Sequence, residues 1–383
     1  MKRTIRLLSA ALALTLTLPL SARAEIAAEK LGDYLYFLQL DDYVRKTVSD
    51  AAPTGMTGGC TCVRSGHLFG RNLDLTYSSV PEFVVHLSGT QDRLESIGVC
   101  ADPYITTDVD EMTQDELLSM PNICNDGINE KGVAVSVNVV MPGDASDLLG
   151  TAPDKEPLWA PYVVRYLLDR AESAEHAAAL LRDVNIVGGF EGYNLHWMIA
   201  DADDTIIAEI QNGSLIISRN EYSFMTNFAM TLGPTQEKQI AAGREFTDLP
   251  LLNDYAIGVE RYALVREHYA EGATEEGMLS LMKSVRATET YRSLPGNRWY
   301  TEFTGVGLPI SASAEAFEAE FEEQCRRYEN RDRLNPQGDW ITWHTSVYNL
   351  AELSLAVYSQ EEYGEAYRFR LNAADGIGTG DGE

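Results

Sequence analysis

The sequence predicts an α+β fold, because its helical and strand-like segments occur in separate blocks. Three observations carry this prediction: one strictly alternating apolar segment, a group of three short apolar runs, and four longer segments with helical periodicity. The strand-like segments are Val133–Val139, Leu195–Ala200, Thr205–Ile210 and Ser214–Ser218, and the helical ones are Pro161–Arg182, Tyr255–Tyr269, Thr274–Arg286 and Ala314–Tyr328. This order differs from the regular βαβ alternation of parallel α/β folds.

The alternating segment places two kinds of side chain on its two faces. Its valines fall on one face, whereas Ala134, Ser136 and Asn138 fall on the other. The three apolar runs after residue 194 follow one another closely enough to form an antiparallel meander. We therefore expect one apolar and one small or polar face on strand 133–139.

The first 24 residues are predicted to be a signal peptide. A basic start with Lys2, Arg3 and Arg6 precedes an apolar run from Leu7 to Leu20, and Ala22-Arg23-Ala24 has the pattern of a cleavage site. The protein is therefore expected to be secreted or extracytoplasmic. No later stretch is long and apolar enough to span a bilayer, so no membrane span is expected after signal removal.

Residues 25–59 are interpreted as a propeptide. Its first half has an apolar stripe that predicts an amphipathic helix, and its second half, Pro53–Gly59, reads as a Gly-rich cleavable linker. The alternative is an N-terminal helix that stays permanently docked, which would leave Cys60 inside the chain. Residues 60–372 are expected to form one catalytic domain, since no linker interrupts them, and residues 373–383 a disordered tail.

The formal net charge of −28 argues against polyanionic partners. A strongly acidic chain repels nucleic acids and anionic membrane surfaces, so neither is expected as a partner. The sequence leaves open whether the protein forms a homo-oligomer. The histidines and acidic residues show no spacing typical of a metal site, and no cofactor or metal is expected.

Cys60 is the candidate nucleophile. It lies in a strand-like run that Ser65-Gly66 would connect to the next run as a two-residue hairpin loop. Counting outward from this loop, Cys60 faces Arg71 and Cys62 faces Phe69. A guanidinium beside the thiol favours the thiolate, and a cysteine that becomes residue one of a mature chain also has its own α-amine as base.

The other interpretations of the cysteines stay open. A Gly-flanked Cys in an apolar run is often a small packing residue. For Cys62, packing is the preferred interpretation. Cys62, Cys100, Cys124 and Cys325 are expected to form either two disulfides or none.

Six segments in order resemble the choloylglycine hydrolase family, which holds bile salt hydrolases and penicillin V acylases. The resemblance runs from Cys60 to about Tyr367 and is carried by Cys60-Thr61, Leu68–Asp74, Asn129–Asn138, Leu195–Asp201 with Met225-Thr226-Asn227, and Trp343–Leu350. It implies an N-terminal-nucleophile (Ntn) hydrolase fold with four αββα layers around two antiparallel sheets. It also implies a cysteine amidohydrolase that cleaves linear, non-peptide amides through a thioester.

The resemblance implies a role for each site residue. Cys60 is the nucleophile and Arg71 its neighbouring cation, whereas Asp74 would hold the α-ammonium of Cys60. Asn138 and Asn227 match the active-site asparagines of the family, Asn138 as an oxyanion donor. The second family arginine best fits Arg292 by spacing, with Arg286 and Arg298 as competitors.

The expected partner is a small amide substrate with a bulky or apolar acyl group. Conjugated bile salts and penicillin V-like N-acyl amides are the first candidate substrates, and N-acyl amino acids and N-acyl homoserine lactones are the second. The alternatives from other classes are an inactive exported binding protein on the same scaffold and a thiol peptidase that uses Cys62 or Cys60 with a distant histidine.

Overall fold

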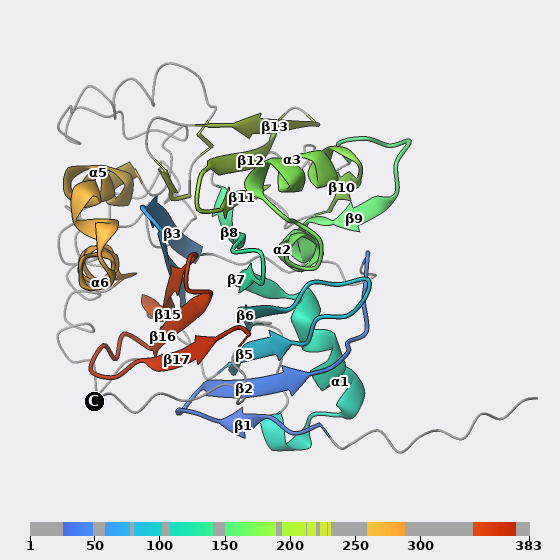
Figure 1. The fold of residues 1–383 in the computed structure, drawn as a ribbon, viewed down its shortest axis with the longest axis horizontal. Helices are drawn as coiled ribbons and strands as arrows, with labels where there is room; N and C mark the ends of the chain where they lie inside the picture. The colour runs from blue at the N-terminus through green and yellow to red at the C-terminus, as the bar shows by residue number, and fades with distance from the viewer. Residues whose placement is uncertain are drawn as a thin grey trace, which may run out of the picture.

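In the computed structural model, the described residues form two main β-sheets with helices packed on them (Figure 1). The described residues are 26–48, 58–76, 80–101, 108–140, 150–188, 194–211, 213–219, 223–227, 229–230, 259–287 and 340–372. The predicted signal peptide, helix 314–328, tail 373–383, Cys325, Arg292 and Arg298 lie outside these ranges.

The larger sheet has nine strands in the order β1-β2-β5-β6-β7-β8-β11-β12-β13. All neighbouring pairs are antiparallel except β2 and β5, which run parallel. The strands are β1 (Glu29–Lys30), β2 (Leu35–Leu40), β5 (Glu82–Leu87), β6 (Ser96–Ala101), β7 (Cys124–Asn129), β8 (Ala134–Val140), β11 (Asn194–Ala200), β12 (Thr205–Gln211) and β13 (Ser214–Ser218).

The smaller sheet has six strands in the order β14-β3-β4-β15-β16-β17, and all of its pairs are antiparallel. They are β14 (Phe224–Met225), β3 (Gly58–Ser65), β4 (Leu68–Thr76), β15 (Trp340–Asn349), β16 (Ser354–Ser359) and β17 (Tyr367–Arg370). A separate parallel pair joins β9 (Pro157–Trp159) to β10 (Asn185–Val187).

Helices cover the outer faces of both sheets, which gives the four layers seen in Figure 1. The helices α2 (Val163–Leu168) and α3 (Ala174–Arg182) pack on the larger sheet, and α5 (Val259–His268) and α6 (Glu275–Ser284) pack on the smaller one. The remaining helical elements are α1 (Gln114–Ser119) and the short 3₁₀ helices Val109–Glu111, Met120–Asn122, Ala160–Tyr162 and Tyr269–Ala273. The predicted α+β class with four layers and two main sheets is confirmed.

Two glycines allow helices to approach the sheets closely. A Cβ on Gly70 of β4 would lie 2.6 Å from Sδ of Met278 in α6, and a Cβ on Gly127 of β7 would lie 2.6 Å from Cδ1 of Leu168 in α2. Both distances are shorter than any ordinary van der Waals contact, so a side chain at either position would push its helix away from the sheet.

The helix predicted within residues 25–59 is wrong, because its apolar residues form strand β2 in the larger sheet. Tyr36, Leu38 and Leu40 point into the core on the α2 side, whereas Leu35 and Phe37 pack on the side of the smaller sheet. Apolar side chains on both faces of a short segment suit a strand buried between two layers, and pairing with the distant β5 fixes that choice.

The other predicted elements that fall within the described residues agree with the structure, with one break. Strand 133–139 and the meander after residue 194 form as expected. Ala134 faces the core shared with the smaller sheet, whereas Val133 and Val135 face the core beneath α2 and α3. The helix predicted over Pro161–Arg182 is divided into α2 and α3 by a turn, where the Ser173 hydroxyl accepts the His176 amide and begins α3.

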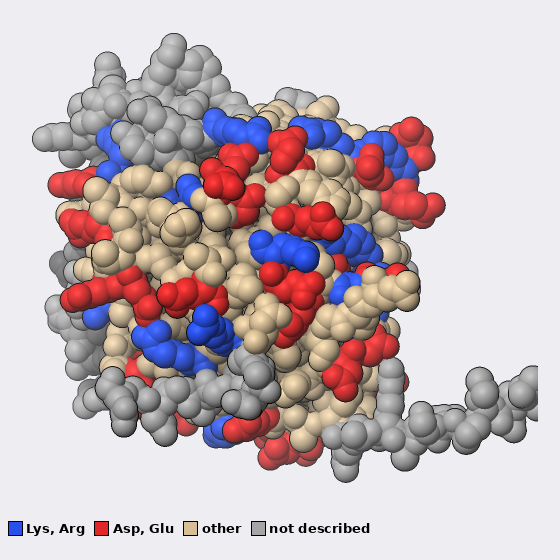
Figure 2. Space-filling view, in the orientation of Figure 1, with Lys and Arg blue, Asp and Glu red and all other residues tan. Residues whose placement is uncertain are grey.

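Charged side chains of both signs lie side by side on the surface drawn in Figure 2. Arg219 pairs with Glu175 and Asp204, and Arg368 pairs with Glu275. Within the described residues, no helix is long and apolar enough to cross a membrane.

Candidate active site

The hairpin of β3 and β4 carries Cys60, and its register differs from the predicted one. Ser65 pairs with Leu68, so the two-residue loop is Gly66-His67 and not Ser65-Gly66. Gly66 has a φ of +58°, which glycine adopts without steric cost and which either loop position allows. Consequently Cys60 faces Leu73 and Cys62 faces Arg71, and the predicted pairs Cys60–Arg71 and Cys62–Phe69 are wrong.

Arg71 nevertheless reaches Cys60 diagonally across the hairpin. Its Nη2 lies 3.8 Å from the Cys60 Sγ, and both side chains are buried. Burial raises the pKa of the Cys60 thiol, while the charges of Arg71 and Arg261 act in the opposite direction. The thiol of the intact chain is therefore protonated near neutral pH and needs a base before it can attack.

Polar side chains hold both the backbone nitrogen and the backbone carbonyl of Cys60. The Cys60 amide donates to Asn227 Oδ1 at 2.6 Å, and the Cys60 carbonyl accepts from Arg261 Nη1 at 2.5 Å. Arg261 also donates from Nη1 to Thr61 Oγ1 at 2.8 Å and from Nη2 to Asn227 Oδ1 at 2.6 Å. The nitrogen of residue 60 is thus fixed at a buried polar position.

Asp74 lies opposite Gly59 in the hairpin, beside the Gly59–Cys60 peptide bond. Its Oδ1 accepts from Thr342 Oγ1 at 2.6 Å, and its Oδ2 is 3.7 Å from Arg261 Nη1. Burial raises the pKa of Asp74 to about 7, against the opposing effects of Arg261 and the Thr342 hydrogen bond. A carboxyl group with this pKa can exchange a proton near neutral pH.

Asn138 and Asn227 each donate a hydrogen bond to the backbone carbonyl of a residue adjacent to the other asparagine. Asn138 donates from Nδ2 to the Thr226 carbonyl at 2.9 Å, and its Oδ1 accepts from Cys62 Sγ at 3.2 Å. Asn227 donates from Nδ2 to the Val139 carbonyl at 2.7 Å. The structure therefore brings Cys60, Arg71, Asp74 and Asn227 together. Asn138 of β8 lies next to Cys62, which is on β3 like Cys60.

Cys62 has an environment that keeps its thiol protonated. It is fully buried against Ser136 Oγ and Asn138 Oδ1, both at 3.2 Å. Burial raises its pKa to about 12, even though Arg71 lies opposite. Cys60, Cys62, Cys100 and Cys124 are all free thiols.

A buried charge network holds Arg71 in place. Its Nε donates to Ser136 Oγ at 3.1 Å and lies 3.3 Å from Asp126 Oδ1, and its Nη2 donates to the Val137 carbonyl at 3.2 Å. His344 lies between two carboxylates, with Nδ1 2.6 Å from Glu82 Oε1 and Nε2 2.8 Å from Asp126 Oδ1. These contacts fix a guanidinium whose own desolvation would otherwise be costly.

His344 and Asp126 of this network have strongly shifted pKa values. Although burial opposes its charge, Glu82 and Asp126 raise the pKa of His344 to about 9. His344 and Arg71 lower the pKa of Asp126 to about 2, again against the effect of burial, and Tyr348 donates to Asp126 Oδ2 at 2.6 Å. Both cations and Asp126 are thus charged at neutral pH.

Arg261 is a site residue that the sequence analysis missed. The predicted Arg292 and its competitor Arg298 lie outside the described residues, and Arg286 pairs with Glu361 at 3.3 Å. Arg261 is almost fully buried on the face of α5 that also buries Tyr262 and Val265. An arginine on the apolar side of a predicted helix was the available signal, since such a residue needs buried acceptors.

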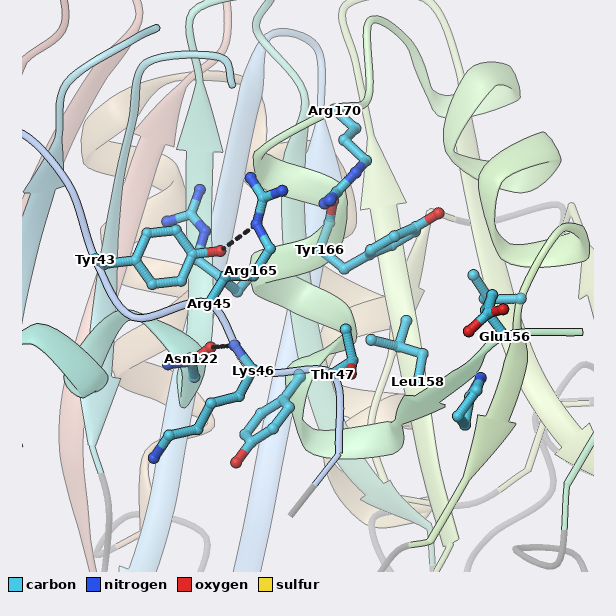
Figure 3. Close-up of a pocket in the computed structure, with 13 residues that line it drawn as sticks. Tyr43, Arg45, Lys46, Thr47, Asn122, Glu156, Leu158, Arg165, Tyr166 and Arg170 are labelled. Atoms are coloured by element: carbon cyan, nitrogen blue, oxygen red, sulfur yellow. Dashed lines mark hydrogen bonds between the residues drawn. The ribbon is translucent and has the colours of Figure 1, made fainter. Parts of the chain in front are cut away.

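The pocket drawn in Figure 3 lies elsewhere in the fold. It opens beside α2 and is lined on one side by Tyr43, Arg45, Lys46 and Thr47. None of the catalytic candidates described above contributes to its lining. Within the described part of the chain, no group of three or more His, Cys, Asp or Glu residues is arranged to hold a metal ion.

Part of this site lies in a segment that matches a known protein family. Residues 60–231 match the family of linear amide C–N hydrolases named the choloylglycine hydrolase family. That match begins at Cys60 and spans β3, β4 and β8. The protein is a hydrolase of linear amide C–N bonds. Over residues 60–231 it is similar to the choloylglycine hydrolase family.

Solved structures of this family also align with the chain at low identity. A mutant of conjugated bile acid hydrolase from Clostridium perfringens shares 15% identity, with 85% of this chain and 97% of that chain covered and a TM-score of 0.43. A second variant of that hydrolase shares 14% identity over 82% and 92%, with a TM-score of 0.45. Penicillin V acylase from Agrobacterium tumefaciens shares 15% identity over 82% and 86%, with a TM-score of 0.44. Among curated proteins, none matches this chain.

Proposed function

We propose that this protein is an exported amidohydrolase whose Cys60 becomes an N-terminal nucleophile when the Gly59–Cys60 bond is cut. The observation that carries the proposal is the buried hydrogen bond from the Cys60 nitrogen to Asn227 Oδ1 at 2.6 Å, beside Asp74. A free α-ammonium at this nitrogen would need such acceptors. The thiol on the same residue lies beside Arg71, which stabilises a thiolate.

Self-cleavage would use the same groups. The Cys60 thiolate attacks the Gly59 carbonyl, the Gly59–Cys60 C–N bond breaks, and the leaving nitrogen takes a proton. Water then hydrolyses the resulting thioester, which releases the Gly59 carboxylate and regenerates the thiol. Asp74, with its pKa of about 7, is suited to take the thiol proton in the first step.

Amide hydrolysis would follow the same chemistry with the freed α-amine as base. Its reference pKa of about 8 lies close to neutrality. The thiolate attacks the amide carbonyl of the substrate, the amine leaves, and water hydrolyses the thioester. Asn138 and Asn227 are the candidate donors to the tetrahedral oxyanion, and Arg261 would hold the strand at residues 60 and 61.

The substrate class rests on the family. Conjugated bile salts or penicillin V-like N-acyl amides are proposed first, and N-acyl amino acids or N-acyl homoserine lactones second. A panel of taurocholate, glycocholate, penicillin V and a long-chain N-acyl amide distinguishes them. Hydrolysis of none of the four would favour the inactive binding protein.

The two neighbouring cysteines provide a matched test of the nucleophile. Cys60→Ser is expected to lose at least about 100-fold in kcat/KM, because the thiolate forms the acyl-enzyme. Cys62→Ser is expected to stay within about threefold of the wild type, since a thiol with a pKa of about 12 supplies no thiolate at neutral pH. Loss of activity through Cys62 alone would instead support the thiol peptidase.

A further inference from the structure

The segment before Cys60 forms a strand within the larger sheet. β2 pairs in parallel with β5 over six positions, from Leu35 opposite Glu82 to Leu40 opposite Leu87. The pairing is extended at both ends, because the Glu82 amide donates to the Tyr34 carbonyl at 2.8 Å and the Ser88 amide donates to the Leu40 carbonyl at 2.9 Å. This segment is therefore part of the hydrogen-bonded sheet of the domain.

Side chains of β2 fill the cores on both faces of that sheet. Leu35 and Leu38 are fully buried, and Leu40 is 2% exposed. The Phe37 ring stacks on Phe369 of the smaller sheet at a centroid distance of 5.5 Å, and Tyr36 lies 5.7 Å from Phe83 of β5. Removal of the strand would open both cores to water.

Polar contacts fix the chain that follows β2. Arg93 donates to the Asp41 carbonyl at 2.8 Å and pairs with Asp42 at 3.2 Å. Tyr43 donates its hydroxyl to Asp169 Oδ2 at 2.8 Å, and Arg45 pairs with the same oxygen at 3.1 Å. Asp169 also forms an ion pair with Arg165 of α2, so these contacts link the segment to the helices on the larger sheet.

Backbone contacts continue to the last described residues of the segment. Asn122 accepts from the Lys46 amide at 2.9 Å and donates to the Val44 carbonyl at 2.7 Å, and Figure 3 shows the first of these bonds. The Trp159 amide donates to the Thr47 carbonyl at 2.7 Å. At the other end, the Tyr367 hydroxyl of β17 donates to the Leu31 carbonyl at 2.7 Å.

We propose that residues 26–48 stay bound after the Gly59–Cys60 bond is cut, so that the mature enzyme consists of two chains. The inference rests on the proposed function for the cut itself. The segment is then a structural subunit and not a discarded propeptide. Its loss would turn β5 into an unprotected edge strand with an apolar face, which is a known liability for aggregation.

The test uses the full chain from residue 25 with an affinity tag in front of Glu25. After self-cleavage, capture through the tag is expected to retain a fragment that begins at Cys60 in a ratio of about one to one, and gel filtration should elute both fragments together. Recovery of the tagged segment alone, together with a folded and active fragment 60–383, would overturn the proposal.

A second variant separates retention from self-cleavage. It combines Cys60→Ala with the recognition sequence of a site-specific protease in place of residues 50–56, so that the cut no longer depends on Cys60. If the first protein stays intact while this one retains both fragments after protease treatment, the activation step is wrong but the subunit proposal holds. Dissociation of the protease-cut fragments in native buffer would contradict the subunit proposal regardless of the mode of cleavage.

Two substitutions in β2 form a matched pair for the protease-cut protein. Leu38→Asp places a charge in the core and is expected to increase the fraction of released segment at least about tenfold. Gln39→Asp adds the same charge at the neighbouring exposed position and should leave the segment bound. Equal release from both variants would show that the buried face of β2 does not hold the segment.

Discussion

At the scale of single residues, Asp74 combines burial with a pKa near neutrality. Its carboxyl group lies between Thr342 and Arg261, and Asp74 is opposite Gly59, next to the peptide bond that would be cut. If Asp74 takes the thiol proton, self-cleavage requires its ionised form. The cleavage rate is therefore expected to rise with pH through about 7 and to level off above it.

Two variants test this role of Asp74. Asp74→Asn should slow self-cleavage by about 10²–10⁴-fold and remove the rise near pH 7, because general base catalysis contributes on that order. Thr342→Val removes the hydrogen bond that lowers the pKa of Asp74, so the midpoint should move to higher pH. The measurement is the rate of fragment appearance against pH, and an unchanged profile in both variants would exclude Asp74 as the base.

At the scale of elements, the contact between β4 and α6 depends on a glycine. A methyl group at Gly70 would overlap the Met278 side chain at 2.6 Å and touch Met282 Cγ at 3.0 Å. Gly70→Ala should therefore lower the free energy of unfolding by about 1–3 kcal/mol, as expected of an overpacked core. Since α6 also supplies the Met282 carbonyl to Asn72, the hairpin that carries Cys60 would shift with it.

Gly364→Ala is the matched control for Gly70→Ala. No atom lies within 4 Å of the Cβ position at Gly364, and its φ is not in the left-handed region. Urea unfolding should give nearly the same stability as the parent for Gly364→Ala. Equal stability of the two variants would show that α6 can move away without cost.

Elements with a local signal were predicted well, whereas distant pairings were missed. The meander β11-β12-β13 follows from alternation and short turns alone. The hairpin loop was misplaced by one residue because Gly66 suits either loop position, and this shifts every cross-strand partner by two residues. The long Arg71 side chain still reaches the thiol, so the predicted chemistry survived the wrong register.

The errors at β2 and Arg261 share one cause. The strand identity of Leu35–Leu40 depends on β5, which follows more than 40 residues later, and no local pattern contains that information. Arg261 acts through acceptors on Cys60, Thr61 and Asn227, far away in the sequence. In both cases tertiary contacts decide the role of the residue, and sequence periodicity cannot supply them.

At the scale of the whole molecule, the network of His344 couples the two sheets and makes stability depend on pH. Its folded pKa of about 9 exceeds the ordinary value of 6.5. The stabilisation from the charged imidazole is therefore fully present below pH 6.5 and is lost as the pH rises through about 9. The shift corresponds to a loss on the order of 3 kcal/mol over this window.

Comparison with His344→Gln isolates this contribution. Both proteins carry Cys60→Ala, which keeps each as a single chain. Urea unfolding of the parent should show the decrease between pH 6.5 and 9, whereas the variant should be less stable at pH 6 and show a flatter decrease. Parallel pH profiles would mean that His344 is not charged in the folded protein.

The proposed activity requires that Cys60 becomes the first residue of the active chain. Intact mass and N-terminal sequence of purified protein from residue 25, measured beside a Cys60→Ala variant, test it most directly. We expect the wild type to yield a fragment that begins at Cys60 and to hydrolyse amides, while the Cys60→Ala protein stays intact and inactive. An uncut wild-type chain with full amidase activity would show that the enzyme does not need a free α-amine at Cys60.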